Sequence, residues 1–311
     1  GRVLIEGCPF EVVILYRDST TPIRTDDYVK AHLRLGHYGP KHICKLMEQG
    51  VNIGLNLKQK HLLTETGKCH CRACVLAKMK RPTKQPRHDL EKLYGELKPY
   101  EFTVSDITGP IDPPAPDGSR YLIHFTCIRT RYTDIYTMVY KSEAGYYLQK
   151  FLVLVHSRGY KAKGMILKTD NDSVFTGDDT DFVKICKQEG VRQKFVDTLM
   201  HEQAAFAESV WRVRSGTARA LLLTSGLGKD KWVWAYRHAN FISNRMPHSN
   251  NKWQIPYTMV FKSQFDMSSI RVFGCKAFFW KDGEKRKKLD DKAVEGVYVG
   301  HAENGSAYCI Y

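Results

Sequence analysis

The pattern of apolar and polar residues in the middle of the chain predicts strands and helices that alternate. Segments in which apolar and polar residues alternate are typical of strands, whereas apolar residues that recur every three or four positions are typical of helices. The expected strands are residues 101–107, 120–129, 134–140, 163–169 and 192–196, and the expected helices are residues 143–158, 178–189, 203–225 and 231–245. Three antiparallel strands followed by strands that alternate with helices make a mixed sheet covered on both faces.

Shorter elements are expected before this region. Residues 2–5 and 10–16 predict a hairpin that turns near residues 7–9. A helix over residues 28–35 should end at Gly36, and Pro40 should open a second helix that continues to Met47. Residues 78–88 are basic, contain two prolines and have little apolar content, which is typical of a linker.

Beyond Pro256 the pattern changes to short strands. They are expected around residues 271–280 and 294–301, on either side of the charged turn 281–288, and together they predict a small β-barrel. The sequence ends at Tyr311 within a strand, so we expect this barrel to be incomplete. The chain thus has three predicted parts, residues 1–88, 95–262 and 265–311, and the middle part has the strand order of ribonuclease H-like α/β domains.

The amino-acid composition indicates which kind of molecule the protein binds. The 311 residues include 48 Lys and Arg against 33 Asp and Glu, a formal net charge of +15 that favours nucleic acid over solubility or an acidic protein as its explanation. No apolar run is long enough to span a bilayer, so no membrane partner is expected. The nine cysteines are irregularly spaced, which fits a reducing compartment. Because the sequence begins without Met or a signal peptide, we interpret it as a piece of a longer chain.

One constellation has the composition of a zinc site. His32 and His37 are followed by Cys71 and Cys74, and zinc takes four nitrogen or sulfur ligands tetrahedrally. The two histidines are five positions apart, roughly 140° of helix rotation, so they cannot share one face of a continuous helix. Gly36 resolves this by ending the helix before His37. With four protein ligands the site should be structural, and folding of the module should depend on it.

Other residues near this constellation leave the ligand set open. Cys69 can compete for the metal, and His42, His61 and His70 are spare imidazoles. The alternative without metal is a set of surface histidines with buried free thiols.

A second constellation is acidic. Asp106 and Asp170 each end an alternating strand, and Glu208 lies in the long helix that follows the last strand. Two strand-end aspartates and a helical glutamate can hold two Mg²⁺ ions about 4 Å apart, the arrangement for in-line displacement at phosphorus. Taken singly, each has a simpler explanation, because strand-end aspartates commonly cap turns and helical glutamates are commonly solvated.

The basic residues most able to meet DNA lie in the linker and on the long helix. Glu208, Arg212, Ser215 and Arg219 form one polar stripe, from which arginine can reach DNA phosphate. The alternative is a simple Glu208–Arg212 pair worth roughly 0.3–0.5 kcal/mol. The candidate DNA-binding residues are Lys78, Lys80, Arg81, Lys84, Arg212 and Arg219.

Several separate stretches, taken together, resemble the integrase region of copia-type long-terminal-repeat retrotransposons, over nearly the whole chain. The stretches that carry the resemblance are residues 32–37, 71–78, 106–110, 168–171, 207–208 with Arg212, 218–222, Trp232, 244–247, 271–277 and 296–301. The last two are similar to the opening of the Src-homology-like barrel that follows the core in this family.

The resemblance implies zinc at His32, His37, Cys71 and Cys74, and Mg²⁺ or Mn²⁺ at Asp106, Asp170 and Glu208. It implies a polynucleotidyl transferase that processes retroelement DNA 3′ ends and joins them to target DNA, acting as a homo-oligomer without a small-molecule cofactor. The locations it implies are the nucleus and a cytoplasmic virus-like particle.

Two departures from the family pattern support a second hypothesis. Asp172 and Val174 stand where the family usually has glycine and glutamate after the second aspartate, and residues 201–206 lack the usual turn before Glu208. An extra carboxylate that displaced Asp170 by about 1 Å would lower the rate on the order of a hundredfold. The second hypothesis is therefore a catalytically decayed or host-adopted DNA-binding protein that keeps the fold.

Overall fold

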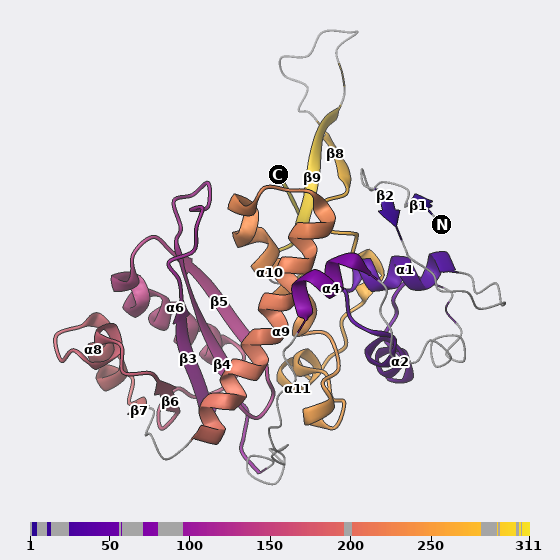
Figure 1. The fold of residues 1–311 in the computed structure, drawn as a ribbon. Helices are drawn as coiled ribbons and strands as arrows, with labels where there is room; N and C mark the ends of the chain where they lie inside the picture. The colour runs from indigo at the N-terminus through magenta and orange to yellow at the C-terminus, as the bar shows by residue number, and fades with distance from the viewer. Residues whose placement is uncertain are drawn as a thin grey trace. The chain divides into compact units, whose positions relative to one another are not determined.

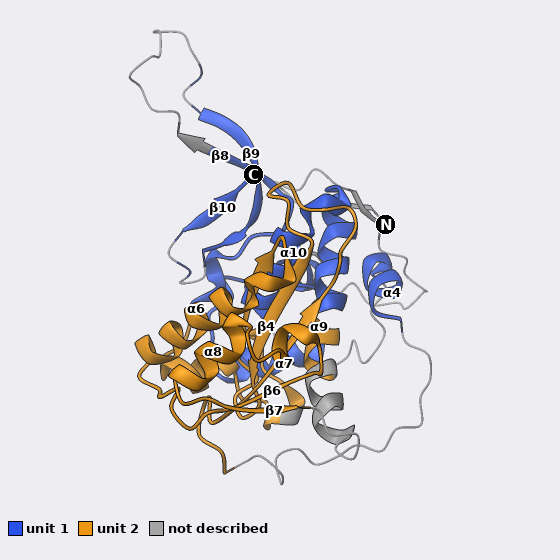
Figure 2. Cartoon of the chain, turned by 90° about the vertical axis from the view of Figure 1, so that its left-hand side faces the viewer, with its two compact units in different colours: residues 1–80, 215–242, 266–311 blue, residues 81–214, 243–265 orange. Residues whose placement is uncertain are grey.

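The structure is a computed structural model that describes residues 2–4, 11–13, 25–55, 57, 71–79, 96–195, 201–280, 291, 293–302, 305 and 307–311, with the backbone alone for residues 2–4, 11–13, 25–26, 201–208, 250 and 279–280. It divides into two compact units (Figure 2). Unit 1 comprises residues 1–80, 215–242 and 266–311, and unit 2 comprises residues 81–214 and 243–265. Both units combine separate stretches of sequence, so the three-part division remains a prediction.

Unit 2 is built on a five-stranded mixed sheet (Figure 1). The strands are β3 (Phe102–Thr108), β4 (Tyr121–Cys127), β5 (Thr133–Met138), β6 (Ile166–Thr169) and β7 (Arg192–Phe195), in the spatial order β5-β4-β3-β6-β7. β4 is antiparallel to β3 and β5, whereas β6 is parallel to β3 and β7. The predicted mixed sheet is confirmed, and its strand ends differ from the expected ones by a few residues.

Helices cover both faces of this sheet. α6 (Ala144–Ser157) buries Leu148, Phe151, Leu152 and Val155, a helical spacing of three and four, in a core shared with α8 (Asp181–Gln188). On the opposite face, Val210 of α9 (His201–Ser225) packs with residues of β3. α7 (Ser173–Thr176) and α11 (Pro256–Phe261) complete the α-helices described in this unit. The opposite face is the one that carries the candidate carboxylates.

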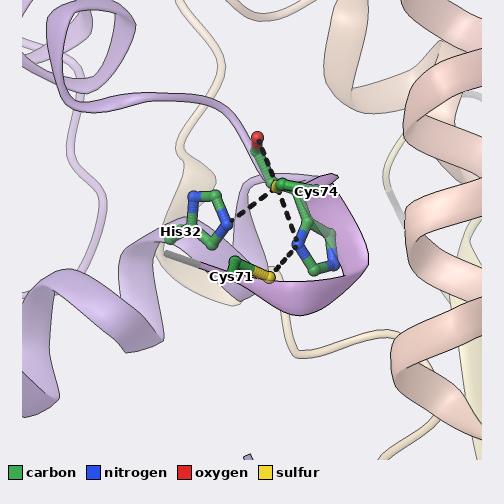
Figure 3. Close-up of side chains that lie close together, drawn as sticks. His32, Cys71 and Cys74 are labelled. Atoms are coloured by element: carbon green, nitrogen blue, oxygen red, sulfur yellow. Dashed lines mark hydrogen bonds between the residues drawn. The ribbon is translucent and has the colours of Figure 1, made fainter. Parts of the chain in front are cut away.

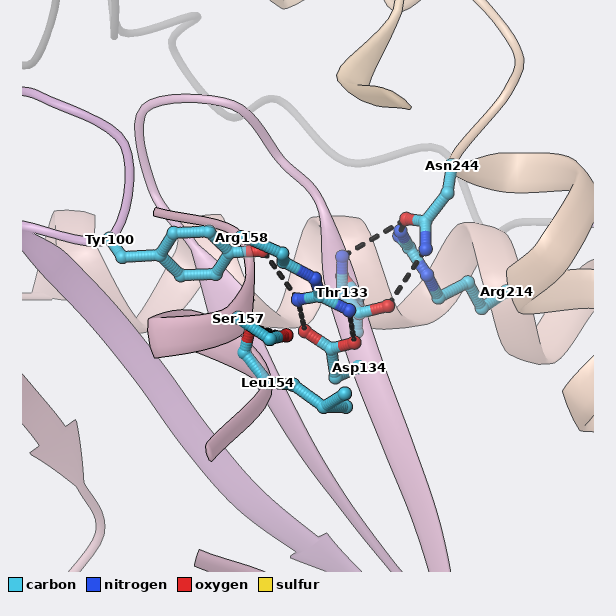
Figure 4. Close-up of polar contacts among 8 residues, drawn as sticks. All are labelled: Tyr100, Thr133, Asp134, Leu154, Ser157, Arg158, Arg214 and Asn244. Carbon is cyan, nitrogen blue, oxygen red and sulfur yellow. Dashed lines mark hydrogen bonds and ion pairs between the residues drawn. The ribbon is translucent and has the colours of Figure 1, made fainter. Parts of the chain in front are cut away.

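Buried polar side chains complete the free edge of β5 (Figure 4). The Asn244 amide accepts a hydrogen bond from Thr133 N at 3.0 Å and donates one to Thr133 O at 2.8 Å, so it takes the place of a neighbouring strand. Arg214 Nη2 donates to the same Asn244 oxygen at 2.9 Å. Next along β5, Arg158 forms a bidentate pair with Asp134, with both N–O distances 2.7 Å.

In the described residues of its N-terminal part, unit 1 forms the helices α1 (Thr25–Arg34), α2 (Pro40–Glu48) and α4 (Arg72–Lys78). It also contains the second half of α9 and nearly all of α10 (Trp232–Ser243), which pack through Ala218, Leu221, Ala235 and Ala239. β1 (Arg2–Leu4) pairs antiparallel with β2 (Glu11–Val13), as the predicted hairpin requires, although its turn lies outside the described residues.

The C-terminal strands of unit 1 form a three-stranded antiparallel sheet in the order β10-β9-β8. They are β8 (Lys276–Trp280), β9 (Ala293–His301) and β10 (Tyr308–Ile310). In the described part of residues 276–311 these three strands form an open sheet. They are the part of the predicted barrel that the structure contains. Single 3₁₀ turns occur at Lys141–Glu143, Lys229–Lys231, Ser249–Asn251 and Met267–Ser269. Over the described residues, no helix combines the length and the apolar character that crossing a membrane needs.

Candidate metal centres

Four side chains from two short segments meet in unit 1 (Figure 3). The ligand atoms of His32, His37, Cys71 and Cys74 all lie within 4.8 Å of one another. Cys74 Sγ is 3.3 Å from His32 Nε2 and 3.7 Å from His37 Nδ1, and Cys71 Sγ is 3.5 Å from His37 Nδ1. Two imidazole nitrogens and two thiol sulfurs at these distances fit a tetrahedral structural zinc site.

The local backbone explains how two histidines five positions apart face one centre. α1 ends at Arg34, and both Gly36 and His37 adopt left-handed backbone, with φ of 64° and 61°. This turn brings the His37 amide to 2.7 Å from His32 O. At Gly36 a Cβ atom would lie 3.1 Å from Thr217 Cγ2, so the close approach to α9 also favours glycine.

Burial keeps the His37 ring in the form that a metal needs. Burial lowers the His37 pKa to about 4, and the positive charge of Lys78 contributes in the same direction. The ring is therefore neutral near pH 7, which is the state of a ligating imidazole. Of the alternative ligands, Cys69, His61 and His70 lie outside the described residues. His42 stacks on the edge of Tyr38 at 5.2 Å and is not part of the cluster.

The sheet register places two of the three predicted carboxylates side by side. β3 and β6 pair in parallel with Phe102 opposite Ile166 and Val104 opposite Lys168. Asp106 lies in β3 four residues past Phe102, and Asp170 follows the last residue of β6 and is four residues past Ile166, so continuing the register sets them at matching positions. Because side chains alternate along a strand, both carboxylates lie on the face that carries Phe102 and Val104.

Helix α9 covers that same face. Its Val210 packs with Phe102 and Val104, and its Trp211 stacks on His124 with ring centroids 4.7 Å apart. His124 lies directly opposite Asp106 in the β3–β4 pair. Glu208 belongs to this segment of α9, and its side chain lies outside the described residues. The described structure therefore puts Asp106 and Asp170 on neighbouring segments of the sheet and the backbone of Glu208 in the helix packed on the Phe102 and Val104 face.

Comparisons with known proteins agree with the resemblance noted in the sequence. The chain is 26% identical over 284 residues, 90% of its length, to the retrovirus-related Pol polyprotein from transposon TNT 1-94 of Nicotiana tabacum. It is 25% identical over 283 residues, again 90% of its length, to that from transposon RE1 of Arabidopsis thaliana. The chain is a homologue of copia-type transposon Pol polyproteins. It spans 20% and 18% of these two relatives.

Two further matches concern parts of this Pol polyprotein homologue. A family described as "Retroviral polymerase SH3-like domain" matches residues 275–311, the segment of the three C-terminal strands. A solved structure, that of the HTLV-2 integrase catalytic core domain in complex with magnesium in a trimeric form, is similar with a TM-score of 0.40 and 13% identity. That similarity covers 53% of this chain and 98% of the other.

Asp172, the departure from the family pattern, has partners of its own. Its carboxylate accepts from Val174 N at 3.2 Å and so caps the N-terminus of α7, and it forms a 2.6 Å ion pair with Lys141. The Lys141 hydrogen bond lowers the Asp172 pKa, and the same bond raises the Lys141 pKa. The extra negative charge beside Asp170 is therefore neutralised locally. The sequence did not reveal this, since Lys141 is 31 positions away.

The predicted DNA-binding residues fall into three groups. Lys80, Arg81 and Lys84 lie outside the described residues. Lys78 Nζ donates to His37 O at 2.8 Å, and Arg219 donates through Nε and Nη2 to Ala77 O at 3.3 and 3.2 Å, so both hold α4 and the His/Cys cluster in place within unit 1. Arg212 is exposed on α9. DNA contact by these residues remains a prediction.

Sequence reasoning gave no role to two other residues at these centres. Lys168 is buried on the face of the sheet that carries Phe102 and Val104, two positions before Asp170. In the sequence it is a lysine at a strand position where the alternation predicts an inward-facing side chain, and this pattern could have identified it. Thr224 contacts His37 from α9, and 187 positions separate them, so no local pattern identifies it.

Proposed function

We propose that this chain is the integrase region of a retrotransposon Pol polyprotein, with a ribonuclease H-like core in unit 2. The observation that carries the proposal is the register of β3 and β6, which sets Asp106 and Asp170 at equivalent strand positions beneath the helix that contains Glu208. Carboxylates placed in this way can hold the two divalent ions of a two-metal phosphoryl transfer site. The Pol polyprotein relatives and the formal net charge of +15 support the same conclusion.

The proposed reaction has two displacement steps at phosphorus. In the first, water attacks a phosphodiester near the end of the retroelement DNA and loses a proton, the bond between phosphorus and the 3′ oxygen breaks, and that oxygen gains a proton and leaves as the 3′-hydroxyl. In the second, that hydroxyl attacks a target phosphodiester, and the target's own 3′-hydroxyl leaves. Each step exchanges one P–O bond for another, so no oxidant, reductant or small-molecule cofactor is needed.

The protein's part is to hold the reacting groups. Asp106, Asp170 and Glu208 would hold Mg²⁺ or Mn²⁺, which when bound supplies activation of the attacking oxygen and stabilisation of the leaving one. Exposed Arg212, on the helix that covers the carboxylates, would orient DNA phosphate. His32, His37, Cys71 and Cys74 would hold zinc, whose binding free energy stabilises the fold around them. We propose action as a homo-oligomer on double-stranded DNA, in the nucleus and in a cytoplasmic virus-like particle.

The test is strand transfer by the full chain with labelled retroelement DNA ends and a plasmid target, in Mg²⁺ and in Mn²⁺. We expect metal-dependent joined product from wild type and none from Asp106→Asn. A wild-type chain that binds the ends with a steep salt dependence and yields no cleavage and no joining would overturn the catalytic proposal. That result would instead support the catalytically decayed or host-adopted DNA-binding protein.

A further inference from the structure

Both histidines of the His/Cys cluster form a hydrogen bond through the ring nitrogen that faces away from the cysteines. His32 Nδ1 is 2.9 Å from Tyr38 O, and His37 Nε2 is 3.1 Å from Thr224 Oγ1. The inward atoms are therefore Nε2 of His32 and Nδ1 of His37, the two that lie within reach of the sulfurs. The two rings present opposite nitrogens to the centre, so their tautomers have to be opposite as well.

The partners fix those tautomers. A backbone carbonyl only accepts, so His32 carries its proton on Nδ1 and leaves Nε2 free. The Thr224 hydroxyl can donate or accept, but it also lies 2.8 Å from Ala220 O, to which it must donate. Its oxygen is then left to accept from His37 Nε2–H. This leaves the lone pair of His37 Nδ1 directed toward Cys71 and Cys74.

We propose that Thr224 is a positioning residue for the metal site. Its hydroxyl selects the His37 tautomer and ring orientation that a zinc ion requires. This inference rests on the proposed zinc site, and it adds to the four ligands a fifth residue from a helix that begins more than one hundred positions after them in the sequence. Outer partners of ligating histidines typically change metal affinity 10- to 100-fold when they are removed.

The packing around Thr224 makes this contact stable. α4 lies on the second half of α9 through the small residues Ala73, Ala77 and Ala220. At Gly216 a Cβ atom would lie 3.3 Å from Lys78 Cγ, and that lysine donates to His37 O. His37 is therefore held through its carbonyl by Lys78 of α4 and through its ring by Thr224 of α9. The Thr224 hydroxyl is itself oriented by its hydrogen bond to Ala220 O.

The experiment compares three variants of the full chain. Thr224→Val keeps the shape of the side chain and removes the hydroxyl, whereas Thr224→Ser keeps the hydroxyl. Thr217→Val is the matched control, because Thr217 lies seven positions earlier on α9, its hydroxyl is buried, and it has no hydrogen-bond partner in the described structure. Zinc affinity is measured by competition with a chelator. The visible spectrum of the Co²⁺-substituted protein and the ¹⁵N shifts of the His37 ring report ligand geometry and tautomer.

We expect Thr224→Val to bind zinc about 10- to 100-fold more weakly, with altered Co²⁺ and His37 signals, while Thr224→Ser and Thr217→Val stay close to wild type. Equal zinc affinity in wild type and Thr224→Val would overturn the role of Thr224 and leave the zinc site intact. An equal loss in Thr217→Val would also overturn it, because packing on α9 would then be the cause. Wild type that binds no zinc would overturn the zinc site and this role with it.

Discussion

The two candidate metal centres are held in different ways. The His/Cys cluster is fixed by side-chain and carbonyl contacts from several segments, including Tyr38, Lys78 and Thr224, so each ligand ring has an assigned orientation. Asp106 and Asp170 owe their positions to strand register, and their own carboxylates make local bonds to the amides of Ile107 and Asp172. The described contacts thus orient the rings of the His/Cys cluster through other residues, whereas strand register and local backbone bonds determine the positions of the two aspartates.

The largest effect expected at the first centre is the loss of its metal. Cys74→Ser removes a buried sulfur ligand, and structural zinc contributes apparent binding free energies of roughly 10–16 kcal/mol in small zinc modules. We expect zinc content to fall from about one ion per chain to nearly none, and residues 25–79 to become sensitive to protease. Cys44→Ser is the control, because Cys44 is buried outside the cluster. Zinc retained by Cys74→Ser would exclude this cysteine as a ligand.

At the carboxylate centre formed by Asp106, Asp170 and Glu208, we expect the largest effect on the rate of strand transfer and little effect on binding or folding. Glu208→Gln keeps size and hydrogen bonding and removes the charge needed to hold a divalent ion. We expect strand transfer to fall on the order of 100- to 1,000-fold, while DNA affinity, zinc content and thermal stability stay close to wild type. Glu189→Gln, at the exposed end of α8, is the matched control. Wild-type activity in Glu208→Gln would refute the assigned triad.

Periodicity predicted the elements of unit 2 well, because a core face imposes spacing on the sequence itself. α6 follows from its apolar spacing, and the ends of β3 at Thr108 and of β6 at Thr169 lie just before the breaker Gly109 and close to the polar residue Asn171, within a few residues of Asp106 and Asp170. Hydrogen bonds between segments that are far apart in the sequence produce no periodic pattern in it. The bonds of Thr224 to His37, of Lys141 to Asp172 and of Arg219 to Ala77 depend on tertiary packing. For the same reason, Lys78 and Arg219 were interpreted from charge alone as candidates for DNA contact.

A smaller effect is expected at Asp172, where the sequence-based and structural interpretations differ. If the extra carboxylate disturbs Asp170, then removing it should raise strand transfer. Because Lys141 already neutralises Asp172 and because Asp172 caps α7, we expect Asp172→Ala to lower the unfolding free energy by about 1 kcal/mol and not to raise activity. Denaturant unfolding and strand transfer measure the two effects.

The Lys141→Gln variant distinguishes the two contributions of Asp172 to stability, the helix cap and the ion pair. It keeps the Asp172 cap and removes a partly exposed pair, so its effect on stability should be about 0–1 kcal/mol. A rise in strand transfer with Asp172→Ala would show that the sequence-based interpretation is right. Asp172, the departure from the family pattern, would then disturb Asp170.

A further effect is expected at His238, a buried histidine that lacks the kind of hydrogen-bond partner that His37 has in Thr224. His238 is enclosed by Phe241, Phe273, Tyr298 and Gly300, and neither ring nitrogen has a hydrogen-bond partner in the described structure. Burial lowers its pKa to about 3, with a further contribution from His301. An imidazole buried without partners costs roughly 1–3 kcal/mol. We therefore expect His238→Phe to raise the unfolding free energy by about 1 kcal/mol at pH 7.5, despite its slightly larger ring.

The same substitution should change the pH dependence of stability in a known direction. An unfolded histidine has its ordinary pKa near 6.5, so between that value and about 3 the unfolded chain binds a proton at His238 that the folded chain does not. Wild-type stability therefore falls as the pH drops below 6.5. His238→Phe removes this contribution, and its advantage should grow by about 2 kcal/mol between pH 7.5 and pH 5. Thr217→Val, which removes a buried hydroxyl that does not titrate, should show an advantage independent of pH. A His238→Phe advantage that stays constant with pH would mean that His238 binds a proton equally in the folded and the unfolded chain, which contradicts the lowered pKa of the buried ring.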